Sequence, residues 1–253
     1  MDRREIMKNS IESTLPPFQG CRRDFLRLMF GACASSGLAG CDFTGDNGRH
    51  GFLDGVSRVN DYVQSALFRK TALAPLYPDS ALTLPFRFNA FYSQASVPEI
   101  DTLSWRLRID GKVQTKTSWD LGAIRALPSI TESTRLICIE GWSAIGKWTG
   151  VPLHKFLTYI GADLSAKYVN FRCADNYYTS IDMASALHPQ TMLAYGFAGN
   201  DVLPDEFGFP LRLRIPTKLG FKNAKHLVEL SVTNNFTGGY WEDLQGYNWF
   251  AGL

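Results

Sequence analysis

Residues 135–154 read Arg-Leu-Ile-Cys-Ile-Glu-Gly-Trp-Ser-Ala-Ile-Gly-Lys-Trp-Thr-Gly-Val-Pro-Leu-His, and this stretch decides the fold. A short run rich in β-branched residues ends around Cys138, and a Glu-Gly-Trp-Ser turn follows it. The pattern predicts a thiol at a strand tip, where a soft ligand can face a cavity. A buried thiol that only packs would have the same spacing, so the residues alone leave both interpretations open.

Two other segments carry polar groups suited to an anionic cofactor. Residues 89–93 read Asn-Ala-Phe-Tyr-Ser, and residues 210–225 hold a Pro-Leu-Arg strand followed by a glycine turn with Lys218, Lys222 and Lys225. Backbone amides of such a turn can converge on an anion while ammonium groups neutralise it. An apolar strand for the first segment and a solvated surface for the second are the alternatives.

Together the three segments resemble the sulfite-oxidase superfamily of molybdopterin oxidoreductases. Within it, they look closest to the catalytic subunits of periplasmic methionine-sulfoxide reductases. The resemblance covers roughly residues 80–250, and it implies an α+β fold with mixed β-sheets and short helices. The cysteine segment is the most specific part of it.

The resemblance implies that Cys138 is the catalytic residue and the metal ligand, and that the cofactor is Mo-molybdopterin. The cofactor-binding residues that it implies are Asn89, Tyr92, Ser93, Cys138, Cys173, Arg212, Asn223, Ala224 and Lys225. Glu140 and Ser143 are expected to orient the turn around Cys138. Candidate contacts for a substrate are Arg135, Lys147 and Arg172, whereas His154 is expected to pack or cap a helix.

Two residues depart from the reductase pattern. Cys173 falls where the reductase subunits carry a threonine, and Phe207 falls where they carry an asparagine. The loss of a hydroxyl and an amide predicts a softer and more apolar pocket. These departures weaken the inference about the substrate more than the inference about the cofactor.

The implied activity is a two-electron oxygen-atom transfer on an S-oxide, a sulfite-like molecule or another small oxo substrate. The substrate is expected to be a small molecule or an oxidised protein side chain. Because the sequence shows no second cofactor motif, we expect electrons to pass through a separate membrane haem or quinone-linked protein. The alternatives are a non-catalytic binding module of the same fold and a thiol-redox protein that uses Cys138 and Cys173.

The first 41 residues resemble an export signal. Arg22-Arg23-Asp24-Phe25 is a twin-arginine pattern, a mildly apolar stretch follows, and residues 38–41 resemble a lipoprotein cleavage box that would acylate Cys41. We therefore expect export by the twin-arginine route to the periplasmic side of the cytoplasmic membrane, with a lipid anchor. A chance Arg-Arg pair before a buried helix is the alternative.

Charge and cysteine spacing exclude several other classes of protein. Residues 1–41 hold six basic and four acidic residues, which leaves twenty of each in the remaining chain. This balance gives no support to a nucleic-acid partner. The spacing of the cysteines and histidines gives no support to zinc, iron–sulfur or covalent haem sites. In an oxidising compartment, a disulfide between Cys138 and Cys173 is a further alternative.

Many short strands with few helices predict an α+β domain over residues 76–253, after a signal over 1–41 and a flexible tether with a short helix over 42–75. The expected strands are 103–109, 135–139, 168–173, 211–215 and 227–233, with a hairpin turn at Asp110-Gly111. The expected helices are 61–70, 121–126, 152–160 and 183–187. Glycine, aspartate and asparagine predict the tether over residues 42–60.

Overall fold

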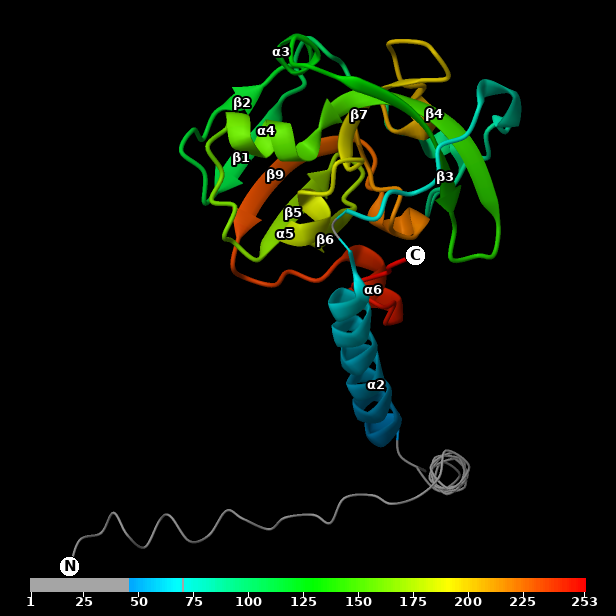
Figure 1. Cartoon of the computed structure of the whole chain (residues 1–253), viewed down its shortest axis with the longest axis vertical. Helices are drawn as coiled ribbons and strands as arrows, with labels where there is room; N and C mark the ends of the chain where they lie inside the picture. Colours follow the sequence, from blue (N-terminus) through cyan, green and yellow to red (C-terminus); the bar gives the residue numbers. More distant parts are fainter. Residues whose placement is uncertain (1–45, 70) are drawn as a thin grey trace, which may run out of the picture. The chain divides into compact units, whose positions relative to one another are not determined.

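The structure is a computed structural model that describes residues 46–69 and 71–253 (Figure 1). The chain divides into two compact units, residues 1–53 and 54–253. The described helices are α2 (Asp46–Leu67), α3 (Leu121–Arg125), α4 (Leu153–Tyr159), α5 (Met183–Ala186) and α6 (Tyr240–Gln245). The strands are β1 (Leu107–Gly111), β2 (Ser118–Trp119), β3 (Ile130–Ile137), β4 (Ser143–Pro152), β5 (Tyr168–Cys173), β6 (Tyr178–Asp182), β7 (Met192–Phe197), β8 (Arg212–Arg214) and β9 (Leu227–Thr233).

These strands form two sheets. The first has the order β2-β1-β9-β5-β6, in which β1 and β9 are parallel and the other neighbours are antiparallel. The second has the order β3-β4-β7-β8 and is antiparallel throughout. In Figure 1, β1 and β2 lie at the left of the domain and the β3–β4 hairpin lies at the right. The mixed sheets and short helices confirm the predicted α+β class.

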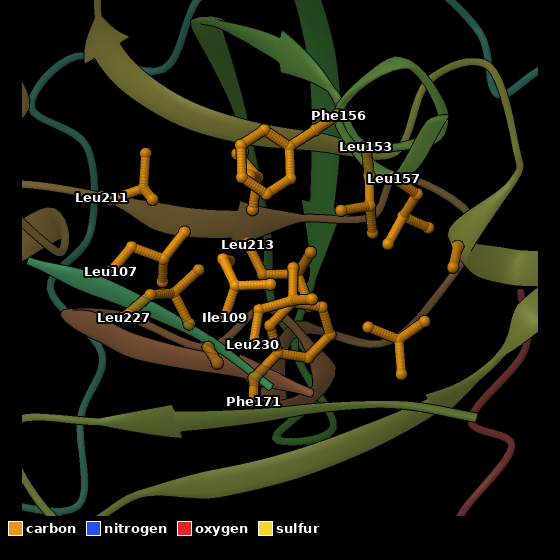
Figure 2. Close-up of a cluster of buried hydrophobic side chains, with 14 of the residues drawn as sticks. Leu107, Ile109, Leu153, Phe156, Leu157, Phe171, Leu211, Leu213, Leu227 and Leu230 are labelled. Carbon is orange, nitrogen blue, oxygen red and sulfur yellow. The ribbon is translucent and has the colours of Figure 1, made fainter. Parts of the chain in front are cut away.

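Strand β7 is buried on both of its faces, and this places a core on each side of the second sheet. Leu193 and Tyr195 belong to the larger core, while Met192, Ala194 and Phe197 belong to the smaller one. Side chains of a strand alternate between faces, so residues 192–195 enter the two cores in turn. The register shift between β4 and β7, which skips Tyr195, then places Phe197 with Met192 and Ala194. Figure 2 shows Leu153, Phe156 and Leu157 of α4 in the same cluster as Leu213 and Leu230. The smaller core carries Leu136 of β3, next to the hairpin tip that holds Cys138.

Several predicted elements are confirmed. β5 and β9 have the predicted bounds, and α3, α4 and α5 agree with the prediction to within one residue at each end. The predicted turn at Asp110-Gly111 is wrong, because both residues continue β1 and pair with β9. A Cβ atom on Gly111 would lie 2.1 Å from the Val232 carbonyl oxygen, so close strand pairing explains this glycine.

The prediction of a flexible tether is wrong for residues 46–60, because α2 begins at Asp46. The helix forms despite the unfavourable Gly51 and Gly55, and Val56, Val59 and Val63, which recur at helical spacing, are exposed. The predicted signal, including Cys41, lies outside the described residues. Among the residues that the structure describes, no helix combines the length and the apolar character needed to cross a membrane.

The larger core predicts which substitution will destabilise the domain. Phe156 is fully buried, so Phe156→Ala should lower the free energy of unfolding by about 3–5 kcal/mol, through lost apolar burial and the cavity left behind. Leu103 is 85% exposed, and Leu103→Ala should change it by less than about 0.5 kcal/mol. Urea unfolding measures both values. Equal effects of the two substitutions would contradict this account of the core.

Candidate active site

Cys138 lies at the tip of the β3–β4 hairpin, as the sequence predicts. β3 ends at Ile137 and β4 begins at Ser143. The Cys138 amide donates to the Trp142 carbonyl oxygen at 2.9 Å, and the Gly141 amide donates to the Cys138 carbonyl oxygen at 3.1 Å. Gly141 has φ +87°, a left-handed conformation that glycine adopts without steric cost. The turn therefore presents the thiol in one orientation, with 6% of the residue exposed.

Polar groups surround the thiol. The Asn89 side-chain amide lies 3.1 Å from Cys138 Sγ and donates to it. Glu140 accepts a hydrogen bond from Trp142 Nε1 at 2.9 Å, which ties two residues of the turn together. Burial raises the pKa of Cys138, although hydrogen bonds from the Glu140 backbone and from Asn89 oppose this effect. A positive partner such as a metal ion would therefore be needed to hold the thiol as a thiolate at neutral pH.

A cavity opens in front of the thiol. It encloses about 1010 Å³ of space between atoms, including its open mouth. The predicted site residues that line it are Asn89, Tyr92, Cys138, Arg212, Asn223, Ala224 and Lys225. Predicted residues from four separate parts of the chain thus converge on one space, with the thiol among them.

Arg212 and Lys225 place positive charge on the cavity wall. Arg212 is 3% exposed and donates only to two carbonyl oxygens, those of Phe207 at 2.8 Å and Asn223 at 3.2 Å, while its Nε has no partner. Lys225 Nζ also donates only to carbonyl oxygens, those of Asn89 at 2.6 Å and Glu206 at 2.7 Å. Throughout residues 55–69 and 71–253, no carboxylate lies within ion-pair distance of either cation.

These two charges are costly in the absence of an anion. Burial lowers the pKa of Arg212 to about 9, and burial together with the charge of Arg212 lowers the pKa of Lys225 to about 7. A buried cation is stable when an anion neutralises it, and the free Nε of Arg212 is a donor without an acceptor. The wall is therefore suited to a bound phosphate.

Asn223 shapes the turn that carries Lys225. Its Oδ1 accepts from Arg214 Nη1 at 2.9 Å and from the Ile215 amide at 2.7 Å, and its Nδ2 donates to the Leu219 carbonyl oxygen at 3.0 Å. Its side-chain amide is thus already engaged within the protein. We infer that Asn223 fixes the backbone of the turn and that main-chain groups at Asn223 and Ala224 face the cavity.

Two predicted cofactor-binding residues do not line this cavity. Ser93 is exposed, and its hydroxyl lies 3.0 Å from the hydroxyl of Ser96. Cys173 packs in the larger core and borders a different, shallower pocket. Both Cys138 and Cys173 are free, so the alternative of a disulfide between them is wrong in this structure.

The candidate substrate contacts also point elsewhere. Lys147 pairs with Asp79 at 2.7 Å, Arg172 lies 3.9 Å from Glu229, and the guanidinium of Arg135 lies over the ring of Tyr77. None of these three lines the cavity with Cys138. His154 lies in the first turn of α4 and is also absent from the cavity wall, in keeping with the expected packing role.

The aromatic residues of the cavity wall were not predicted from the sequence. Phe91 stacks on Tyr177 at 6.0 Å between ring centroids, and Trp241 stacks on Tyr247 at 5.7 Å. Asp175 was also missed, and it accepts a hydrogen bond from Tyr92 at 3.1 Å. Phe91 lies inside the Asn-Ala-Phe-Tyr motif, so its contribution could have been inferred. The contributions of Asp175, Trp241 and Tyr247 depend on long-range packing.

The site can hold a metal only together with a bound group. Over the described part of the chain, no cluster of three or more His, Cys, Asp or Glu residues is placed to hold a metal ion. A metal at Cys138 would therefore take further ligands from a non-protein group. A thiol facing buried cations fits a metal–pterin whose phosphate lies on the cationic wall.

The pKa of Lys225 predicts a pH dependence of stability in the anion-free domain. The folded-state pKa is about 7 and the reference value is 10.5, so the unfolded state binds this proton more tightly between these values. Below pH 7, Lys225 is protonated in both states, and burying its charge lowers the stability of the folded domain by the full amount. As the pH rises from 7 towards 10.5, the folded state loses the proton first and this loss of stability disappears. From pH 7 to pH 9, Lys225 should contribute a gain of about 2 kcal/mol that Lys225→Met lacks. Urea unfolding at both pH values measures it, and parallel profiles for the two proteins would contradict the assignment.

Comparisons with known proteins support a molybdopterin-binding site in this chain. The family model for the oxidoreductase molybdopterin binding domain matches residues 94–241. The sulfane dehydrogenase SoxCD from Paracoccus pantotrophus has a similar structure, with a TM-score of 0.52 and 21% identity over 58% of this chain and 42% of that chain. At this identity the likeness shows the fold.

Relatives in sequence are more similar. YedZ1 of Azospira oryzae, which its name gives as a proposed protein-methionine-sulfoxide reductase subunit, is 53% identical over 91% of this chain and 87% of its own. The protein-methionine-sulfoxide reductase catalytic subunit MsrP of Xanthomonas axonopodis pv. citri is 32% identical over 59% of this chain, which matches 52% of MsrP. The chain thus spans about half of MsrP. The chain belongs to the family of molybdopterin-binding oxidoreductases of the sulfite-oxidase superfamily, and its cofactor is Mo-molybdopterin.

Proposed function

We propose that this domain carries out a two-electron oxygen-atom transfer and that its substrate is a methionine sulfoxide. The observation that carries the proposal is the buried thiol of Cys138 at a cavity that Arg212 and Lys225 also line, where neither cation pairs with a carboxylate of the described residues. The names of YedZ1 and MsrP support the choice of an S-oxide substrate. Reduction of a sulfoxide takes up two electrons and two protons and releases a thioether and water.

Different residues of the cavity would bind different parts of the cofactor. Cys138 would ligate the metal, Asn89 would hold the sulfur by its hydrogen bond, and Arg212, Lys225 and the backbone at Ala224 would bind the phosphate. When bound, the cofactor supplies the redox-active metal at which the sulfoxide loses its oxygen. Tyr92 would contact the pterin with its ring, because its hydroxyl already donates to Asp175.

The rim of the cavity suits a thioether side chain. Ile139, Phe91 and Trp142 all line the cavity, and Ile139 and Phe91 are also exposed to solvent. These apolar groups would pack on the methyl and methylene groups of a methionine sulfoxide and exclude water from the thiol. Glu140 also lines the cavity, where its carboxylate keeps the Trp142 ring in place through the Nε1 hydrogen bond.

The electrons for this reaction must come from a donor. We propose a separate membrane protein that carries haem or is linked to quinone. The description of YedZ1 and MsrP as subunits supports a multi-protein reductase. The thiol-redox alternative has little structural support, because Cys138 and Cys173 are free and border different pockets.

Replacement of the thiol is the direct test of the metal site. Cys138→Ser should abolish reduction of methionine sulfoxide and lower the molybdenum bound per chain, because the soft ligand is lost. Cys173→Thr is the matched control, since Cys173 belongs to the larger core and is not among the residues that line the cavity, and it should retain molybdenum with a modest change in turnover. Metal analysis and a reduced-dye assay measure both effects. Full activity in Cys138→Ser would refute the proposed role.

We also propose that the chain is exported by the twin-arginine route and is held at the periplasmic face of the cytoplasmic membrane by acylation of Cys41. The residues concerned lie outside the described structure, and the sequence pattern alone supports this proposal. Cys41→Ser should release the mature protein from membranes, and Arg22→Lys with Arg23→Lys should leave the precursor in the cytoplasm. Fractionation measures both. A wild-type mature protein that is soluble would contradict the lipid anchor.

A further inference from the structure

The last residues of the chain lie against the loop that forms the cationic wall. We call residues 248–253 the tail and residues 217–225 the cradle loop. The Leu219 amide donates to the Ala251 carbonyl oxygen at 2.9 Å, and the Leu253 amide donates to the Thr217 carbonyl oxygen at 3.1 Å. Lys218 pairs with Gly252 as in a β-bridge. The tail therefore supports the start of the cradle loop along its backbone.

Lys218 holds the cradle loop to the tail, and it does not line the cavity. Its Nζ donates to the Phe250 carbonyl oxygen at 2.5 Å and lies 3.4 Å from the centre of the Phe250 ring. Asp182 lies 3.4 Å from the same atom, and Lys218 is 1% exposed. Burial lowers the pKa of Lys218 to about 8, while Asp182 opposes this shift. A buried lysine that lost these partners would carry an unpaired charge, so the contact holds the loop strongly.

Lys222 forms a second fastening of the same kind. Its Nζ lies 2.5 Å from Glu242 Oε1 in α6, and both side chains are almost fully buried. The Trp249 ring of the tail lies 5.3 Å from the same Nζ. Neither Lys218 nor Lys222 lines the cavity, whereas Lys225, the lysine of this motif that was predicted to bind the cofactor, does. They position the loop, and Lys225 alone among them faces the cavity.

The other edge of the tail is bound to helix α2. The Phe250 amide donates to Asp61 Oδ1 at 2.7 Å, and the Gly252 amide donates to Gln64 Oε1 at 3.0 Å. Residues three apart lie on one face of a helix, so α2 offers two acceptors in a row to the tail. The Phe68 ring packs edge-on against Phe250 at 5.7 Å. Successive backbone groups of the tail therefore bind α2 and the cradle loop alternately.

We propose that the tail is a positioning element for the cofactor, which couples helix α2 to the cradle loop. By this route, Asp61 holds Phe250 and Gln64 holds Gly252. Phe250 in turn holds Lys218, and Lys218 fixes the backbone that leads to Asn223 and Lys225. Loss of the contacts at α2 would loosen the phosphate-binding wall without altering a residue of the cavity. The inference rests on the assignment of that wall to the molybdopterin phosphate.

The test is a double variant on α2, Asp61→Ala with Gln64→Ala, in the full chain. Its matched control is Tyr62→Ala with Ser65→Ala, which has the same helical spacing and changes exposed side chains. Two lost hydrogen bonds should speed amide hydrogen exchange at residues 219–223 about tenfold in the cofactor-free protein. The half-time of molybdopterin release from the loaded protein should shorten by about the same factor. The control should stay within about twofold of wild type in both measurements.

Unchanged exchange at residues 219–223 in the double variant would overturn the coupling. Faster exchange with an unchanged release half-time would overturn the positioning role, because the loop would then loosen without any effect on the cofactor. Lys218→Met, which keeps the length of the side chain and removes its charge, should produce the same two changes and leave α2 intact. A wild-type chain that never takes up molybdopterin would contradict the proposed function, whereas the exchange measurement would still decide the coupling.

Discussion

Two positive charges that pair with no carboxylate of the described residues, those of the buried Arg212 and the partly buried Lys225, are the constraint on which the site depends. A folded domain tolerates such charges at a cost that a bound anion removes. Because they line the same cavity as Cys138, one bound group can satisfy two demands, a soft ligand contact at the thiol and a negative charge at the cations. A metal–pterin with a phosphate meets both, and the family of the chain agrees with this chemistry.

Two parts of the fold hold the site residues in fixed positions, namely the hairpin that carries Cys138 and the cradle loop that carries Lys225. The β3–β4 hairpin holds the thiol through backbone hydrogen bonds and a left-handed glycine. The cradle loop is anchored by two of its own side chains: Lys218 binds the tail, and Lys222 binds Glu242 of α6. Asn223 adds three hydrogen bonds from within. The cavity can therefore present donors that are fixed before the cofactor arrives, which reduces the entropic cost of binding.

The sequence predicts local parts of this arrangement well and its packing less well. Cys138 at a strand tip follows from a β-branched run that ends in a glycine turn, and β5 and β9 follow from alternation. The direction of Lys218 and Lys222 could not be predicted, because residues far along the chain, Phe250 and Glu242, decide which lysines are buried. The aromatic wall depends on similar distant contacts. The helical character of residues 46–60 was obscured by glycine and asparagine, which are common in loops.

Some basic residues of the motif line the cavity and others only support the loop. A cationic motif in the sequence therefore does not by itself predict which of its residues contact the bound group. Of three lysines in one short motif, a single one reaches the cavity.

The central claim is that Cys138 is a ligand of molybdenum, and X-ray absorption at the molybdenum edge tests it most directly. The account predicts a sulfur ligand in the wild-type protein that disappears in Cys138→Ser. An identical sulfur coordination in both proteins would contradict it.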